Sequence, residues 1–135
     1  LKALAALGRG DSTEARRLLT QSDSAAPDKY APPQWWGYRP LIAAHAWAEL
    51  GENQLALREL DSYTPSRLNS SGLDVRWLLV GQARVLRGEI YERQGRRPEA
   101  RDQYQLALNQ WQGADSLLEP LVNRVKARLG RLADG

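Results

Sequence analysis

The sequence predicts an all-helical fold made of antiparallel helical hairpins, and three observations support this. Apolar residues recur at steps of three and four along most of the chain, which is the period of an amphipathic helix. Short polar turns centred on Gly10, Gly51 and Gly95 interrupt that pattern. Small residues alternate with large ones beside the turns, which lets two antiparallel helices approach closely. We therefore expect paired helices and no β-sheet.

Composition sets outer limits on the class of protein. The 135 residues suffice for one domain, and no apolar run is long enough to cross a membrane. The absence of cysteine excludes disulfides and thiolate metal sites and leaves the compartment open, with the cytoplasm slightly favoured. The chain has no methionine, and its first residues already read as the middle of a helix. We therefore expect a piece of a longer protein, folded as one domain over residues 1–135.

The clearest hairpin is predicted over residues 73–112. Gly95 can adopt the left-handed backbone that ends a helix, and Pro98 fits the first turn of the next helix, where its missing N–H costs nothing. The residues on the facing sides of the two helices are Gly88, Tyr91, Ala100, Tyr104 and Ala107. We expect the tyrosines and alanines of this set, together with Trp47 of the preceding hairpin, to be buried between helices.

Two further hairpins are predicted over residues 1–22 and 40–65. Each has a turn glycine, then an alanine, then a larger residue, at the same offsets as in the hairpin just described. The three sets are Gly10, Ala15 and Leu19; Gly51, Ala56 and Leu60; and Gly95, Ala100 and Tyr104. The three alanines are unevenly spaced along the chain, so the repeat is irregular, with the surplus residues between hairpins and in a longer first helix of the third.

The segment between the first two hairpins, residues 23–40, has no helical period. It contains four prolines, and we predict a long connection there. Trp35 and Trp36 lie in this segment. They either fill the gap between hairpins or contribute to a binding surface.

A terminal helix is predicted over residues 117–133. It has one apolar face and a polar face suited to capping a stack of hairpins. Arg124, Arg128 and Arg131 lie together on the polar side, and we interpret them as solvated surface.

No pattern typical of a catalytic site occurs in the sequence. His45 is the only histidine, and Glu49 alone does not complete a metal site with it. Glu89 and Glu92, next to Arg93, are interpreted as a solvated face with local charge pairs. The chain has no phosphate-binding glycine loop and no nucleophile elbow. We expect no catalysis, no cofactor, no metal and no small-molecule substrate.

The residues of the third hairpin stand at the spacing of a tetratricopeptide repeat (TPR): Gly88, Tyr91, Gly95, Ala100, Tyr104 and Ala107. The chain therefore resembles a TPR domain, in which helical hairpins of about 34 residues stack side by side. The resemblance implies a right-handed solenoid of hairpins with a capping helix. The closing stretch, from Tyr104 to Leu129, is also similar to TPR arrays found C-terminal to bacterial serine/threonine kinases and winged-helix transcriptional regulators.

The TPR resemblance also implies a binding site for a protein or peptide, in a concave groove lined by the first helix of each hairpin. Carried over position by position, the groove residues are Tyr38, Leu41, His45, Glu49, Gln82, Val85, Glu89, Glu92 and Arg93. This set is part apolar and part acidic, so it suits a segment with an apolar anchor and a basic residue. Leu41, His45 and Leu86 stand where TPRs that bind chaperone tails need Lys, Asn or Arg, which argues against that ligand.

Three functions follow from the sequence. The first is a non-catalytic protein-interaction module within a bacterial signalling or regulatory protein. The second is a scaffold that joins domains or self-associates as a homo-oligomer. The third is nucleic-acid binding by the basic terminal helix, which the interspersed acidic residues disfavour.

Overall fold

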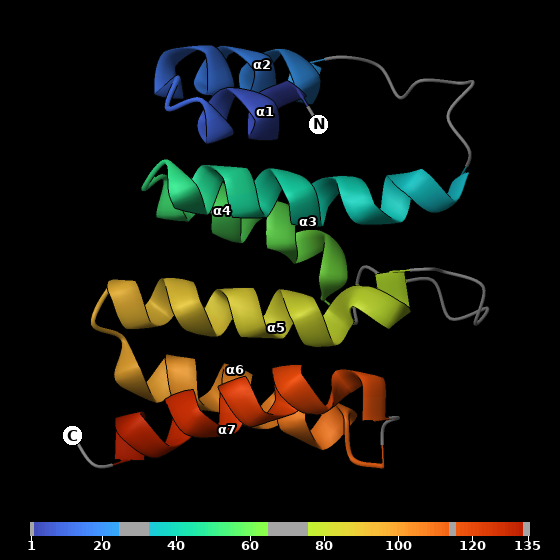
Figure 1. The fold of residues 1–135 in the computed structure, drawn as a ribbon, viewed down its shortest axis with the longest axis vertical. Helices are drawn as coiled ribbons and strands as arrows, with labels where there is room; N and C mark the ends of the chain where they lie inside the picture. The colour runs from blue at the N-terminus through green and yellow to red at the C-terminus, as the bar shows by residue number, and fades with distance from the viewer. Residues whose placement is uncertain (1, 25–32, 65–75, 114–115, 134–135) are drawn as a thin grey trace. The chain divides into compact units, whose positions relative to one another are not determined.

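The computed structural model describes residues 2–24, 33–64, 76–113 and 116–133, and every regular element in these ranges is helical. In chain order these are α1 (Lys2–Gly8), α2 (Ser12–Ser24), α3 (Pro33–Glu49), α4 (Asn53–Leu60), the short η1 (Asp61–Tyr63), α5 (Arg76–Arg93), α6 (Arg97–Gln110), the short η3 (Ser116–Leu118) and α7 (Glu119–Ala133) (Figure 1). The prediction of an all-helical fold is thus confirmed for the described residues. The chain divides into two compact units, Leu1–Trp77 and Leu78–Gly135.

Three hairpin turns with the same hydrogen bonds join α1 to α2, α3 to α4 and α5 to α6. Gly10, Gly51 and Gly95 have φ angles of 76°, 77° and 73°, so each ends its helix in the left-handed region. In each turn, the N–H of the next residue donates to the carbonyl five positions back, at N–O distances of 2.9, 2.9 and 2.8 Å. The predicted turns are confirmed, and one local geometry occurs three times.

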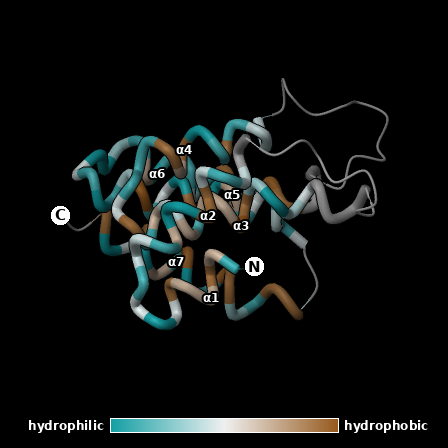
Figure 2. The backbone as a smooth tube through the Cα atoms, turned by 90° about the horizontal axis from the view of Figure 1, so that it is seen from above, coloured by the Kyte–Doolittle hydropathy of each residue, from teal (hydrophilic) through white to brown (hydrophobic). Residues whose placement is uncertain are grey.

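In the first unit, α1 pairs with α2, α3 pairs with α4, and α3 also contacts both helices of the first pair. Trp47 of α3 and Leu60 of α4 are core residues, 4% and 0% exposed. Figure 2 shows brown hydrophobic positions alternating with teal hydrophilic ones along these helices, as amphipathic packing requires. Arg16 of α2 links the two pairs at the surface, because its guanidinium binds the Glu52 carboxylate and donates to the Leu50 carbonyl oxygen at 3.2 Å.

Helix α3 starts earlier than predicted, because residues 33–40 are helical rather than part of a connection. Pro33 fits the first helical turn, where no N–H partner is needed. Pro40 lies inside the helix, where it lacks an N–H and its ring crowds the carbonyl four residues earlier. Trp35 and Trp36 belong to the first turns of α3, and both interpretations of their side chains lie outside what the structure describes.

The side chain of Tyr63 compensates for the break that Pro40 imposes on α3. Tyr63 lies in η1 and is 1% exposed. Its hydroxyl donates to the Gly37 carbonyl oxygen and accepts a hydrogen bond from the Leu41 N–H at 3.0 Å. In an uninterrupted helix this N–H and this carbonyl would bind each other. The hydroxyl thus bridges an opened turn, and α3 continues through its proline.

In the second unit, aromatic side chains of the α6 segment pack directly on glycines of α5. A β-carbon added at Gly88 would lie 2.7 Å from Cδ1 of Tyr104, and one at Gly81 would lie 2.6 Å from Cε2 of Trp111. Real β-carbons essentially never approach this closely, so both positions need the missing side chain of glycine. The α5–α6 hairpin therefore has two glycine–aromatic contacts, which lie seven residues apart on each helix.

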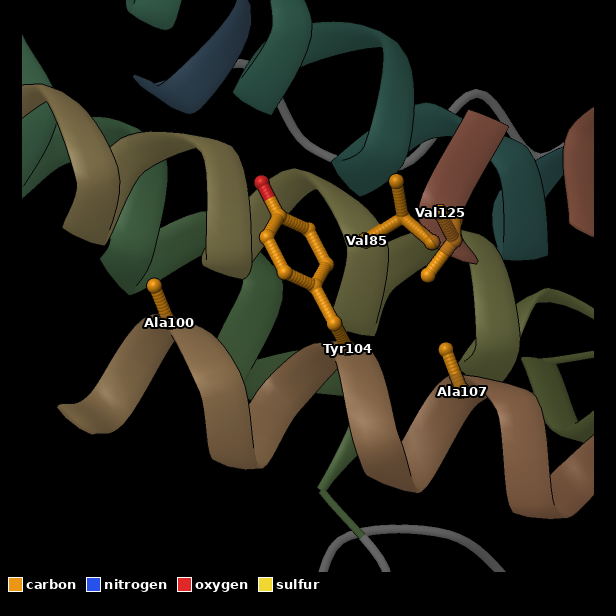
Figure 3. Packing of buried hydrophobic residues seen from close by; sticks show 5 residues of the cluster. All are labelled: Val85, Ala100, Tyr104, Ala107 and Val125. Carbon is orange, nitrogen blue, oxygen red and sulfur yellow. The ribbon is translucent and has the colours of Figure 1, made fainter. Parts of the chain in front are cut away.

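Helix α7 completes the core of this unit. Figure 3 shows Ala100, Tyr104 and Ala107 on one face of α6, on the side where Val85 of α5 and Val125 of α7 lie, and the five residues form one buried cluster. Four of the five predicted core residues are confirmed as buried: Trp47, Ala100, Tyr104 and Ala107. The fifth, Tyr91, is only half-buried, with the guanidinium of Arg96 lying 4.3 Å from its ring centroid.

The end of the chain agrees with the predicted terminal helix over residues 117–133. The single turn of η3 leads directly into α7, which runs from Glu119 to Ala133. Gly113 also has a positive φ, of 72°, and gives a fourth left-handed turn after α6 that the sequence patterns did not single out.

Candidate functional site

The predicted groove residues of the first unit lie on α3 and are mostly exposed. Tyr38, His45 and Glu49 are exposed and share one face, because they are separated by seven and four residues. Ile42, half-buried, lies on the same face between Tyr38 and His45 and was missed by sequence reasoning. Its helical spacing from Tyr38 becomes evident once α3 is known to begin at Pro33. We name Tyr38, Ile42, His45 and Glu49 the α3 surface.

Leu41 does not belong to this surface, contrary to the prediction. It is 7% exposed and is a core residue, and its backbone N–H donates to the Tyr63 hydroxyl. At 100° per residue Leu41 lies only about 60° from Tyr38 and about 40° from His45, so helical spacing alone does not separate it from them. Because Leu41 is buried, a change there would alter packing before it altered binding.

The predicted groove residues of the second unit lie on α5 and fall into two groups. Gln82 and Arg93 are exposed. Val85, Glu89 and Glu92 share one face and are covered in part: Val85 is 7% exposed and packs in the core with Val125 of α7. The structure brings these three side chains together, but helix α7 of the same chain packs against them. We name Val85, Glu89 and Glu92 the α5 face.

Arg128 of α7 forms ion pairs with both carboxylates of the α5 face. The guanidinium lies 3.8 Å from Glu89 and 3.5 Å from Glu92, and its side chain is 30% exposed. The Tyr104 hydroxyl donates to the same Glu92 carboxylate at 2.5 Å. The interpretation of Arg128 as solvated surface is therefore wrong, whereas Arg124 and Arg131 are exposed as predicted. The helical period placed Arg128 on the polar side correctly but carried no information about the distant α5.

These contacts determine the electrostatics of the network. Burial, and then Glu92, raise the pKa of the Tyr104 hydroxyl, because both disfavour the phenolate. Burial alone would lower the pKa of Arg128, but Glu89, the Tyr104 hydroxyl and Glu92 together raise it. Tyr104 thus remains a neutral hydrogen-bond donor and Arg128 remains a cation. The positive charge on α7 can therefore offset the negative charge of the two carboxylates on α5.

A shallow cleft of about 540 Å³ opens between α6 and α7. Its lining combines apolar side chains with amide, hydroxyl and charged groups; the lining residues are Gln105, Leu108, Asn109, Trp111, Gln112, Gly113, Ser116, Glu119, Val122 and Lys126. None of the predicted groove residues lines it. Sequence reasoning missed the cleft because it depends on how α7 is placed against α6, which the apolar period of either helix does not determine.

Within residues 2–24, 33–64, 76–113 and 116–133, no group of three or more His, Cys, Asp or Glu side chains is arranged to hold a metal ion. In the same ranges, no helix has the length and apolar character needed to span a bilayer. The chain matches no protein-family model, no curated protein and no solved structure.

Proposed function

We propose that this chain is a non-catalytic protein-interaction module of the TPR type, built as a right-handed solenoid of hairpins. The support is the threefold repetition of one hairpin geometry, with the same glycine torsion and turn hydrogen bonds. The alanine that follows each turn, at Ala15, Ala56 and Ala100, is fully buried in all three hairpins. Repetition of backbone geometry and buried small residues is what stacked helical repeats require.

The proposed partner is a peptide or protein segment with an apolar anchor and a basic residue, bound on the α3 surface. One observation carries this: Tyr38, a large aromatic side chain, is 44% exposed on the same face as the exposed Glu49. An exposed aromatic residue offers contact area at low entropy cost, and the carboxylate favours a cation beside it. Ile42 contributes apolar area between them.

The similarity of the C-terminal stretch to TPR arrays of bacterial kinases and winged-helix regulators supports a role within a signalling or regulatory protein. Nucleic-acid binding by α7 is less supported than the sequence suggested, because Arg128 is engaged with Glu89 and Glu92. Only Arg124 and Arg131 of the original three arginines remain exposed.

A peptide library displayed on phage and selected against the 135-residue chain would test the proposal. We expect enrichment of peptides that combine an apolar and a basic residue. Tyr38→Ala and Glu49→Arg should each weaken binding of a selected peptide about tenfold or more by fluorescence anisotropy. Leu106→Ala and Asp102→Arg on α6 are matched controls, since Leu106 is 42% exposed and Asp102 is an exposed carboxylate.

Two outcomes would count against this function. If the α6 controls abolished binding and the α3 variants did not, the α3 surface would have to be abandoned. If no peptide were enriched and the molar mass of the chain rose with concentration, self-association as a scaffold would replace peptide binding.

A further inference from the structure

The α5 face is already occupied by a segment with the chemistry that the sequence predicts for a partner. The acidic and apolar side chains of this face call for an apolar anchor and a cation. Helix α7 supplies both: Val125 is fully buried in the core with Val85, and Arg128, three residues later, pairs with Glu89 and Glu92. Three residues separate neighbours on one helix face, so a single helix presents both groups together.

The polar contacts that hold α7 in place are long. Arg128 lies 3.5 and 3.8 Å from its two carboxylates, whereas a charge-assisted hydrogen bond is about 2.7–2.9 Å. At the C-terminal end of α7, Arg97 of α6 reaches the carbonyl oxygens of Arg131 and Leu132 at 3.4 and 3.3 Å. Apolar burial therefore provides most of the attachment, and a guanidinium placed closer to Glu89 and Glu92 would bind better than Arg128 does.

We propose that the α5 face is a binding surface for a helix of another protein that carries an aliphatic residue followed three positions later by arginine, and that α7 occupies this face until such a helix displaces it. Arginine fits better than lysine, because a planar fork can bind two carboxylates at once. Among the described residues, Arg128 is the one cation paired with these two carboxylates, so the face keeps a surplus of acceptors. The proposal goes beyond the proposed function and uses a different helix in a different unit, sharing with it only the premise that the chain binds proteins.

The probe is a capped synthetic peptide with the sequence of residues 116–133, labelled for anisotropy and titrated with the full 135-residue chain. We expect Arg128→Ala in the chain to strengthen peptide binding about fivefold, because a weakened α7 leaves the α5 face vacant more often. The same peptide carrying Arg128→Glu should bind at least about tenfold more weakly, since it places a carboxylate against Glu89 and Glu92. The peptide carrying Arg124→Glu is the matched control and should bind like the parent peptide.

Circular dichroism first confirms that each chain variant is folded; if Arg128→Ala is not, Arg128→Lys replaces it, because it keeps the charge and loses the fork. A chain carrying both Glu89→Gln and Glu92→Gln should lose the preference for the parent peptide over the Arg128→Glu peptide.

The proposal is overturned if the peptide binds neither the parent nor the variant chain, or if these substitutions do not change its affinity. It is also overturned if light scattering shows a doubled mass that the peptide reverses, since a second copy would then be the occupant. Tyr38→Ala should leave these results unchanged, so failure of the α3 surface is distinguishable from failure here.

Discussion

The ring of Tyr104 lies directly on the backbone of Gly88, where any β-carbon would be 2.7 Å from its Cδ1 atom. Seven residues earlier on α5, Gly81 accepts Trp111, which lies seven residues after Tyr104. Equal and opposite steps along the two helices define one antiparallel register. The α5–α6 hairpin is thus aligned by two glycine–aromatic contacts, and the core that α7 completes depends on that alignment.

Replacing Gly88 should show how much this contact contributes. Gly88→Ala is expected to lower the free energy of unfolding by about 1–3 kcal/mol, because the ring of Tyr104 must move away from the added methyl group. Urea denaturation followed by circular dichroism measures the difference. Gly130→Ala in α7 is the control: nothing lies near its β-position, so the change should stabilise by about 0.5–1 kcal/mol through helix propensity. Equal effects at the two glycines would contradict the packing described for Gly88.

The Tyr63 hydroxyl should contribute in a way that depends on Pro40. Tyr63→Phe leaves the Leu41 N–H and the Gly37 carbonyl without their bridge, and should cost about 1–3 kcal/mol in thermal or urea unfolding. In a Pro40→Ala background the helix can close the bond between Gly37 and Leu41 directly, so the same substitution should cost less. A double-mutant cycle measures this coupling. Additive costs would show that the hydroxyl does not compensate for the proline.

The sequence was sufficient to predict the helices, their glycine turns and most of the core, because these depend on local periodicity and on residues close in the chain. Gly10, Gly51 and Gly95 could be recognised from their positions between apolar repeats alone. The start of α3 could not, because a proline disfavours a helix interior locally, and the hydrogen bond from Tyr63 that offsets this cost comes from a residue distant in the sequence.

The candidate site was predicted less well, for a similar reason. Spacing placed Tyr38, His45 and Glu49 on one exposed face correctly, but it could not show that Leu41 turns inward. Glu89 lies on α5 and its partner Arg128 lies on α7. The residue pattern within one helix carries no information about a contact with another helix. The contacts of α7 with α5 had to come from the structure.

Arg128 should matter for stability where Arg124 does not. Arg128→Ala removes a cation that faces Glu89 and Glu92, and we expect it to lower the free energy of unfolding by about 1 kcal/mol, since the three side chains are partly exposed and screened. Arg124→Ala, on the exposed side of α7, should change it by less than about 0.5 kcal/mol. The difference should shrink in 1 M salt, where the Debye length is about 3 Å. A larger effect at Arg124 would contradict the assigned ion pairs.

The alkaline limb of the stability curve should depend on Tyr104. Burial and the neighbouring Glu92 raise the pKa of its hydroxyl above the usual value of about 10, so the folded state holds its proton more tightly than the unfolded chain does. The associated stability is fully present below pH 10 and is lost as the pH rises above it, because the unfolded tyrosine then ionises while the folded one still keeps its proton. Tyr104→Phe removes this contribution and has no effect on the other tyrosines. We therefore expect the free energy of unfolding of the parent chain, measured in urea between pH 8 and about pH 11, to fall more steeply above pH 10 than that of the variant. Parallel curves would show that the Tyr104 hydroxyl ionises as readily in the folded chain as in the unfolded one, and would contradict the raised pKa.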